Sequence, residues 1–259
     1  MQIDVKSDYH MHTVYSDGNA TIAEMVQSAI QKGMDQITFT DHMPLPWDND
    51  YAMRIDNIEK YKQEIELTQK NNLGKIRINK GIEFEFLPAF VPWIQSILDK
   101  KWDYKILSVH NIYKNNQPLD VNGSAEDFSV LLKNFDHDIK AVCLEYYNII
   151  QTAVQFGWFD IVGHLDVIKK HNFNQQYFDD SAPWYRSIVL ETLDIIKKQG
   201  MKMEVNMSGF NDPVKEQHPS KWIIQEASKR NIPLVLSSDS HKSKSIGQNF
   251  NIIDGLLQK

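Results

Sequence analysis

The stretch Gln36-Ile37-Thr38-Phe39-Thr40-Asp41-His42 contains the pattern on which the fold prediction rests. A short apolar run with β-branched and aromatic residues predicts a buried strand, and this one ends at an acid and a histidine. Similar runs recur along the chain and end at His110, at His164 and at Asp239-Ser240-His241. Longer segments of helical periodicity lie between them. This alternation is typical of βα units and a parallel sheet.

The predicted elements amount to about seven βα units. Strands are predicted over residues 5–12, 36–40, 75–84, 104–109, 159–163, 202–206 and 233–237. Helices are predicted over residues 21–32, 57–70, 92–100, 183–199 and 220–230, and residues 124–156 are predicted to be mostly helical. No linker, charge block or repeat divides the chain, so we expect one α/β domain over residues 1–259. A TIM-barrel-like (β/α) barrel of seven strands is favoured, and a doubly wound open sheet is the alternative.

The composition disfavours several classes of protein. The chain has 259 residues, with 28 Lys and Arg against 34 Asp and Glu, and its formal net charge of -6 disfavours nucleic acid as a partner. No apolar run approaches the length of a membrane span, and the N-terminus lacks the apolar core of a signal peptide. We therefore expect no membrane partner and a cytoplasmic location. Cys143 is the only cysteine and is expected to pack in the core. The oligomeric state is not set by these features.

Histidines and carboxylates occupy almost every predicted strand end. In parallel barrels the functional side chains gather at the carboxyl ends of the strands. The sequence therefore predicts a single site at that end, built from His10, His12, Asp41, His42, Glu83, His110, His164, Asp239 and His241.

The spacing of these residues favours metal binding. In His10-Met11-His12 an extended chain sends both imidazoles to one face, which suits Zn, Mn or Fe. Asp239-Ser240-His241 repeats this spacing with a carboxylate and an imidazole. Glu83 has two carboxylate oxygens, which is enough to bridge two cations. Asp17 lies in the loop just beyond the first strand.

Each motif taken alone has a structural alternative. The two histidines of the first strand could be a surface or core-edge pair, and Asp41-His42 could cap a helix or form a buried hydrogen-bonded pair. His164 could cap a turn, and Glu83 could lie at a solvated strand edge, with Glu85 as the rival carboxylate. The occurrence of such residues at successive strand ends favours the metal cluster over these alternatives.

Three histidines are expected to lie outside the site. His137 and His218 occur in polar segments and are predicted to be solvated, and His171 follows two lysines. Other catalytic motifs are absent from the sequence, because it contains neither a G-x-S-x-G elbow nor a P-loop nor G-x-G-x-x-G.

The set of motifs resembles the polymerase and histidinol phosphatase (PHP) family of metal-dependent phosphoesterases. The matching residues span positions 8 to 241 and are Asp8-Tyr9-His10-Met11-His12-Thr13, Ser16-Asp17-Gly18, Thr40-Asp41-His42, Gly81-Ile82-Glu83, Ser108-Val109-His110, Gly163-His164-Leu165-Asp166 and Ser238-Asp239-Ser240-His241. The chain length, without an appended polymerase region, is similar to the stand-alone histidinol-phosphate phosphatase branch.

This resemblance implies a distorted seven-stranded barrel that holds three divalent cations, with Zn, Mn and Fe all possible. By position, His10, His12, Glu83 and Asp239 would bind the first cation. Glu83 would bridge to a second cation bound by His110 and His164. Asp17, His42 and His241 would bind the third.

The resemblance also implies hydrolysis of L-histidinol phosphate to L-histidinol and phosphate, a step of histidine biosynthesis. Glu83, Asp239 and His241 are the expected catalytic residues. The leaving group would take its proton from an acid, with Asp239 and His241 as the candidates, or from a metal-bound water. Lys169 and Arg54 are expected to contact the substrate, with a solvated surface turn as the alternative for Lys169. Two other functions stay open, namely a phosphoesterase for another small phosphate ester or nucleotide, and a non-catalytic metal-binding module.

Overall fold

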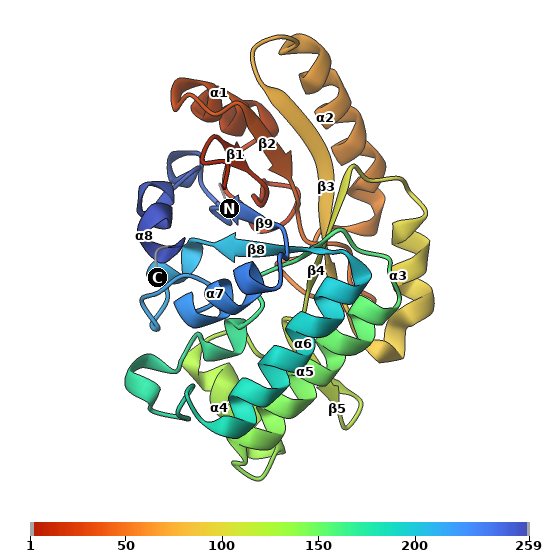
Figure 1. Ribbon diagram of the computed structural model, residues 1–259. Coiled ribbons are helices and arrows are strands. Elements are labelled where there is room, and N and C mark those ends of the chain that lie inside the picture. Colours follow the sequence, from red (N-terminus) through yellow and green to blue (C-terminus); the bar gives the residue numbers. More distant parts are fainter. Residues whose placement is uncertain (1–2, 258–259) are drawn as a thin grey trace.

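Seven parallel strands form the barrel at the centre of the molecule, and helices surround it (Figure 1). The computed structural model describes residues 3–257. The strands follow the order β1-β2-β3-β4-β7-β8-β9. Their bounds are β1 (Ser7–Asp8), β2 (Gln36–Phe39), β3 (Arg77–Glu85), β4 (Tyr104–Ser108), β7 (Ile161–Val162), β8 (Lys202–Asn206) and β9 (Leu234–Ser237).

The barrel closes between β1 and β9 through contacts just beyond β1. The backbone N–H of Tyr9 donates to the carbonyl of Leu236 over 3.2 Å, and that of His12 donates to the carbonyl of Ser240 over 2.9 Å. Met11 and Ser240 form a parallel bridge. The predicted seven-stranded distorted (β/α) barrel is therefore confirmed, and the open-sheet alternative is wrong.

The first strand is shorter than predicted. The ladder with β2 covers only Ser7–Asp8, instead of residues 5–12. Beyond it the backbone N–H of Met11 donates to the hydroxyl of Thr40 over 3.1 Å, and the carbonyl of Met11 accepts from the N–H of Thr40 over 2.9 Å. Side-chain and bridge contacts thus replace the regular ladder where the chain turns its histidines inward.

The helices cover the outside of the barrel and follow the predictions closely, except that the last helix was not predicted and that one predicted segment is two helices. They are α1 (Ile22–Gln31), α2 (Ile58–Asn71), α3 (Val91–Leu98), α4 (Ala125–Asn134), α5 (Ile139–Gln155), α6 (Pro183–Gln199), α7 (Lys221–Lys229) and α8 (Ile253–Leu257). The helical segment predicted over residues 124–156 is two helices, because Asp136 and His137 both adopt positive φ, which interrupts a helix. The side chain of Asp138 then caps α5 by accepting from the N–H of Ala141.

A small hairpin follows β4 that the sequence analysis did not predict. Strands β5 (Asn111–Lys114) and β6 (Gln117–Asp120) pair antiparallel. The two residues between them, Asn115 and Asn116, both have positive φ, as the tight turns preferred in hairpins require. The Asn-Asn pair was the available sequence signal.

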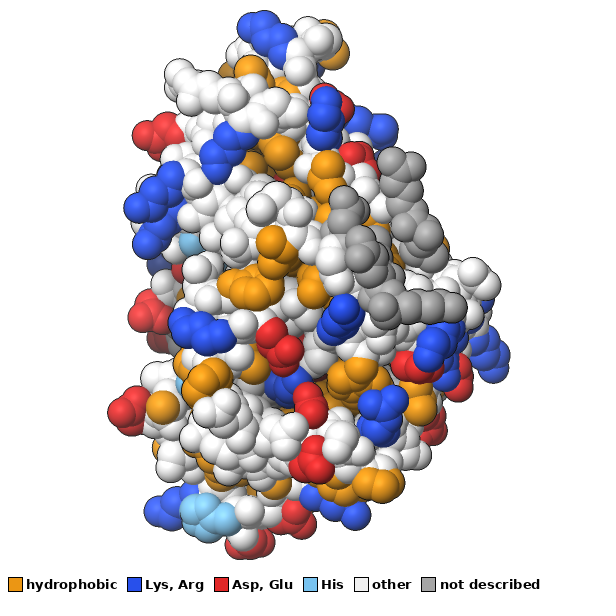
Figure 2. Space-filling model, turned by 60° about the vertical axis from the view of Figure 1, so that its left-hand side comes forward, with side chains coloured by type: hydrophobic (Ala, Val, Ile, Leu, Met, Phe, Trp, Pro, Cys, Tyr) orange, Lys and Arg blue, Asp and Glu red, His pale blue; other side chains and the backbone are white. Residues whose placement is uncertain are grey.

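Most of the apolar interior is one large cluster that extends from Ile3 to Ile253, and Ile106, Ile161 and Val235 form a second, small cluster. Cys143 is fully buried in the large cluster, as predicted. The outer residues 1–2 and 258–259 of the expected 1–259 domain lie outside the described part, and the single-domain assignment stays a prediction. Within residues 3–257, no helix has the length and apolar character needed to cross a membrane. On the face shown in Figure 2, acidic and basic side chains are interspersed.

Candidate metal centre

Eight of the nine side chains predicted from the strand ends lie, together with Asp17, in one cluster at the carboxyl end of the barrel. The ninth, Asp41, instead accepts hydrogen bonds from Thr13 and Ser16 in the loop after the first strand. Each of the nine residues of the cluster has a nitrogen or oxygen atom within 3.8 Å of another member. They come from the segments that follow β1, β2, β4, β7 and β9, and from within β3 itself. The members are His10, His12, Asp17, His42, Glu83, His110, His164, Asp239 and His241.

Glu83 lies at the centre of the cluster and is 1% exposed. Its Oε1 atom is 3.0 Å from Nε2 of His164 and 3.3 Å from Nε2 of His110. The hydroxyl of Ser108 donates to the same oxygen over 2.6 Å. One carboxylate oxygen of Glu83 thus faces the imidazoles of His110 and His164, which follow β4 and β7.

The other oxygen of Glu83 faces a different set of imidazoles. Oε2 lies 2.7 Å from Nδ1 of His42, 3.4 Å from Nε2 of His10 and 3.6 Å from Nε2 of His12. None of these contacts has hydrogen-bond geometry, so within residues 3–257 this buried oxygen has no hydrogen-bond partner. The two oxygens of Glu83 therefore face two separate groups of ligand atoms, which is the arrangement of a bridging carboxylate.

Asp17 and His241 form the more exposed edge of the cluster. Oδ2 of Asp17 lies 3.1 Å from Nε2 of His241 and 3.8 Å from Nε2 of His42. The loop that carries Asp17 packs tightly on the backbone of His12, since a Cβ on Gly18 would lie 2.5 Å from the His12 carbonyl oxygen. Only glycine lets the loop approach so closely.

Asp239 reaches the cluster from an uncommon backbone conformation. Its φ of 49° lies in the left-handed region, which aspartate tolerates better than most residues. Its Oδ1 atom lies 3.2 Å from Nε2 of His12 and 3.7 Å from Nε2 of His10. The turn after β9 therefore places a carboxylate opposite the two histidines of the first strand.

The donor geometry fits divalent cations. Nε2 of His10 and Nε2 of His12 are 3.0 Å apart, and Nε2 of His110 and Nε2 of His164 are 3.2 Å apart. Two imidazoles on one tetrahedral zinc, with Zn–N of about 2.0–2.1 Å, would hold their nitrogens about 3.3 Å apart. Among the described residues 3–257, three groups of side chains have ligand atoms close enough to share an ion, namely His12, Asp17, His42 and His241; His10, His12 and Glu83; and His42, Glu83 and His110.

The protonation states of His12 and Glu83 suit cation binding. Burial and the neighbouring imidazoles of His241 and His42 lower the pKa of His12 to about 4, so its ring is neutral at pH 7. Burial opposes the charge of Glu83, but the imidazoles of His42 and His10 outweigh it and hold its pKa well below the usual range. Neutral imidazoles and ionised carboxylates are the forms that bind metals.

Two further carboxylates, which sequence analysis did not place in the site, orient the histidines from behind. Oε1 of Glu204 lies 2.7 Å from Nδ1 of His10, and Oε2 of Glu85 lies 2.8 Å from Nδ1 of His110. Such contacts fix the tautomer and leave Nε2 free for a cation. Glu85, considered as a rival to Glu83, thus has this supporting position. The signal for Glu204 was a lone acid inside the apolar strand β8.

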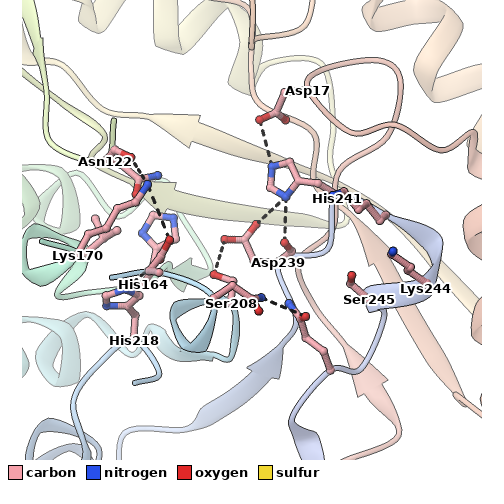
Figure 3. Close-up of a pocket in the computed structure, with 15 residues that line it drawn as sticks. Asp17, Asn122, His164, Lys170, Ser208, His218, Asp239, His241, Lys244 and Ser245 are labelled. Carbon is pink, nitrogen blue, oxygen red and sulfur yellow. Dashed lines mark hydrogen bonds and ion pairs between the residues drawn. The ribbon is translucent and has the colours of Figure 1, made fainter. Parts of the chain in front are cut away.

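A cavity of about 560 Å³ opens onto the cluster. In Figure 3, Lys170, His164 and His218 lie on one side of this cavity, and Asp17, Asp239 and His241 lie on the other. Lys170 provides a cation near the cluster, with its side chain 20% exposed. The lining of the cavity thus combines part of the predicted ligand set, namely Asp17, His164, Asp239 and His241, with basic residues.

The two predicted substrate-contacting residues lie elsewhere. The ammonium of Lys169 is buried and bonds to Asp180 and Glu216, each over 2.7 Å, and to the hydroxyl of Ser220 over 2.6 Å. Arg54 is exposed, just before a short 3-10 turn. Neither residue lines the cavity. Lys169 therefore occupies neither the phosphate-facing position expected for it nor the solvated turn considered as the alternative.

The prediction for His218 is wrong. This residue is 2% exposed rather than solvated, because its backbone N–H and carbonyl both pair with Asn206 at the end of β8. It lines the cavity. The other two histidines lie outside the cavity lining, with His137 exposed and the ring of His171 3.0 Å from the carbonyl of Gly123.

The fold and the cluster together define a parallel barrel whose carboxyl end carries side chains suited to several divalent cations. The model of the PHP domain family matches residues 8–208, and the chain belongs to this family.

Two relatives of similar length are named as histidinol-phosphatases. The chain is 30% identical to the "Probable histidinol-phosphatase" of Deinococcus radiodurans over 94% of this chain and 89% of that protein. It is 29% identical to the "Histidinol-phosphatase" of Bacillus subtilis over 93% and 96% of the two chains. The structure of histidinol phosphate phosphatase from Lactococcus lactis, complexed with Zn, L-histidinol and phosphate, matches with a TM-score of 0.78 and 26% identity, over 97% of this chain and 92% of that one.

Proposed function

We propose that this protein is a metal-dependent phosphomonoesterase that hydrolyses L-histidinol phosphate to L-histidinol and inorganic phosphate. The observation that carries the proposal is the cluster around Glu83, whose two carboxylate oxygens face separate sets of imidazoles. The relatives that match nearly the whole chain support the choice of substrate.

The proposed ligand sets follow the three parts of the cluster. His10, His12, Glu83 and Asp239 would hold one cation, and Glu83 would share a second with His110 and His164. Asp17, His42 and His241 would hold the third. Imidazole and carboxylate donors suit Zn, Mn and Fe. Cations bound there would activate water for attack and neutralise the charge of the phosphate.

The residues of this chain then have distinct tasks. Glu83 connects two parts of the cluster, because its Oε2 atom faces His42 and its Oε1 atom faces His164. Asp239 and His241 form the wall of the cavity that meets the substrate. Lys170, on the same cavity, is placed to contact the phosphate oxygens as a point charge. No side chain is required as a covalent nucleophile.

The test of this function is a comparison of substrates. Purified protein supplied with Zn²⁺ or Mn²⁺ is assayed for phosphate release from L-histidinol phosphate, glycerol 3-phosphate, a nucleoside monophosphate and a phosphodiester. We expect kcat/KM to be highest for L-histidinol phosphate. A higher kcat/KM for another ester would show that this ester is the preferred substrate. If no phosphate is released from any of the esters, the protein would be a metal-binding module without phosphatase activity.

A further inference from the structure

Of the two ring nitrogens of His218, one has a hydrogen-bond partner within residues 3–257 and the other has none. Nδ1 lies 2.9 Å from Oδ1 of Asp166, a hydrogen-bonded contact. Nε2 is buried, and no group within residues 3–257 forms a hydrogen bond with it. An unpaired buried polar atom costs about 1–3 kcal/mol. Because the ring lines the cavity, a bound ligand is the partner that this nitrogen lacks.

The ring is held in place by a buried polar network. Oδ2 of Asp166 accepts from the N–H of Ser220 over 2.8 Å and from its hydroxyl over 2.6 Å. The ammonium of Lys169 lies 2.6 Å from the same hydroxyl and is anchored by Asp180 and Glu216. This network explains the buried position of Lys169, which acts on the site through Ser220 and Asp166.

The space beside Nε2 depends on a glycine. A Cβ on Gly209 would lie 2.9 Å from Nε2 and 2.7 Å from Cδ2 of His218, and 2.2 Å from the carbonyl oxygen of Glu216. The charged group that faces this side of the ring is Asp212, with Oδ2 3.6 Å from Nε2. The imidazole edge is therefore held in a fixed orientation, and the glycine keeps a side chain from filling the space beside it.

We propose that His218 is a catalytic residue that donates its Nε2 proton to the leaving oxygen of the phosphate ester. This inference rests on the phosphatase function proposed above. The bond between phosphorus and the ester oxygen breaks, and its electron pair stays on that oxygen, which takes the proton from His218. Water supplies the oxygen of the new bond to phosphorus. The proton that this water releases restores the charged imidazole through solvent.

The two acids expected from the sequence fit this task less well. Nδ1 of His241 lies 3.0 Å from the backbone carbonyl oxygen of Asp239, and its Nε2 lies 3.1 Å from Asp17, so both nitrogens are engaged. Oδ2 of Asp239 accepts from Asn206 over 3.1 Å and from Ser208 over 3.3 Å, while Oδ1 faces the histidines of the cluster.

The charge state of His218 is consistent with a donor. Burial opposes its charge, but the hydrogen bond to Asp166 and the nearby carboxylate of Asp212 outweigh burial and raise its pKa to about 9. The ring therefore carries a proton at neutral pH.

The experiment compares leaving groups that differ in their need for a proton. Wild-type protein and His218→Gln, both supplied with Zn²⁺, are assayed on L-histidinol phosphate, whose alkoxide needs a proton, and on p-nitrophenyl phosphate, whose phenolate leaves without one. We expect kcat on histidinol phosphate to fall on the order of 10²–10⁴-fold. Activity on p-nitrophenyl phosphate should match that of His171→Gln, a control that alters another buried histidine outside the cavity lining.

The possible outcomes separate the two proposals. An equal loss on both esters, or no loss on either, would overturn the role of His218 while leaving the phosphatase function intact. If wild-type protein hydrolyses neither ester, the proposed function itself fails, and the role of His218 with it. Should His218→Gln not fold, Asp166→Asn gives the same readout, because without the carboxylate charge the imidazole loses its proton at lower pH. An unchanged ratio of the two rates in that variant would also contradict the proposal.

Discussion

The carboxylate of Glu204 lies 2.7 Å from Nδ1 of His10 and turns Nε2 of that imidazole towards Glu83. The same carboxylate accepts from the backbone N–H of His164 and from the hydroxyl of Ser237. Glu204 is fully buried, and burial raises its pKa, but the contact with His10 outweighs this effect and lowers the pKa. One buried acid on β8 thus orients ligands from two other strand ends.

Replacing Glu204 with glutamine should weaken metal binding without removing a ligand. Loss of an orienting partner behind a metal-binding histidine typically lowers metal affinity by about 10–100-fold. Competition with a chelator measures this affinity in wild type and Glu204→Gln. The matched control is Glu191→Gln, at an exposed position on α6. Unchanged affinity in Glu204→Gln would show that His10 does not depend on this carboxylate.

Neighbouring lysines should respond differently to the same substitution. Lys169→Met leaves Asp180 and Glu216 without their ammonium partner, and we expect a loss of stability of up to about 3 kcal/mol, the lower end for a broken buried pair because both acids are partly exposed. Lys170→Met should raise KM for the phosphate ester with little change in stability, because Lys170 lines the cavity. Urea unfolding and steady-state kinetics on both variants provide the comparison. A raised KM in Lys169→Met together with a loss of stability in Lys170→Met would show that Lys169, and not Lys170, contacts the phosphate.

Stability should depend on pH through His218. Its pKa is raised from 6.5 to about 9, with Asp166 and Asp212 facing the ring and the Lys170 ammonium 3.9 Å from Asp212. A raised pKa stabilises the folded state fully below the unfolded value of 6.5, and this contribution is lost as the pH rises through about 9. We expect wild type to lose on the order of 3 kcal/mol more than His218→Gln over this interval. Urea unfolding of both proteins in the same metal state measures the difference. Parallel pH profiles would exclude a charged His218.

Removal of metal should lower thermal stability. Ions that bind the folded state alone stabilise it by mass action, and the cluster otherwise buries several carboxylates and imidazoles without counter-ions. We expect a chelator to lower Tm and Zn²⁺ to restore it, with saturation at three ions per chain, one for each proposed ligand set. Saturation at one ion would contradict the three-cation assignment.

The strand-end cluster could be predicted because parallel strands bring their carboxyl ends together. His110 and His164 lie 54 residues apart in the sequence, yet their Nε2 atoms are 3.2 Å apart because β4 and β7 are neighbours in the sheet. The hydrophobic periodicity of the sequence predicted the positions of the strands. Because the strands are parallel neighbours in one sheet, their carboxyl ends lie together. For the same reason the barrel itself could be predicted from the alternation of strands and helices.

The supporting residues could not be predicted, because their roles arise from contacts that no local pattern encodes. Glu204 and His10 are 194 residues apart and meet only across the barrel. His218 precedes a proline in a polar segment, which is typical of a solvated loop, and it is buried only because that segment pairs with Asn206. Lys169 and Lys170 are neighbours in the sequence, yet only Lys170 lines the cavity, while the ammonium of Lys169 bonds to Asp180 and Glu216. Which of the two lysines faces the cavity depends on the local turn.

The most direct test of this account is the rate of phosphate release from L-histidinol phosphate by wild type, Glu83→Ala and His110→Ala, with bound metal measured on the same samples. Glu83 joins the two halves of the cluster, and His110 lies 3.3 Å from its Oε1. We predict turnover by wild type, and loss of both activity and bound metal in each variant. Near-wild-type turnover with full metal occupancy in either variant would contradict the bridging centre on which the proposed function rests.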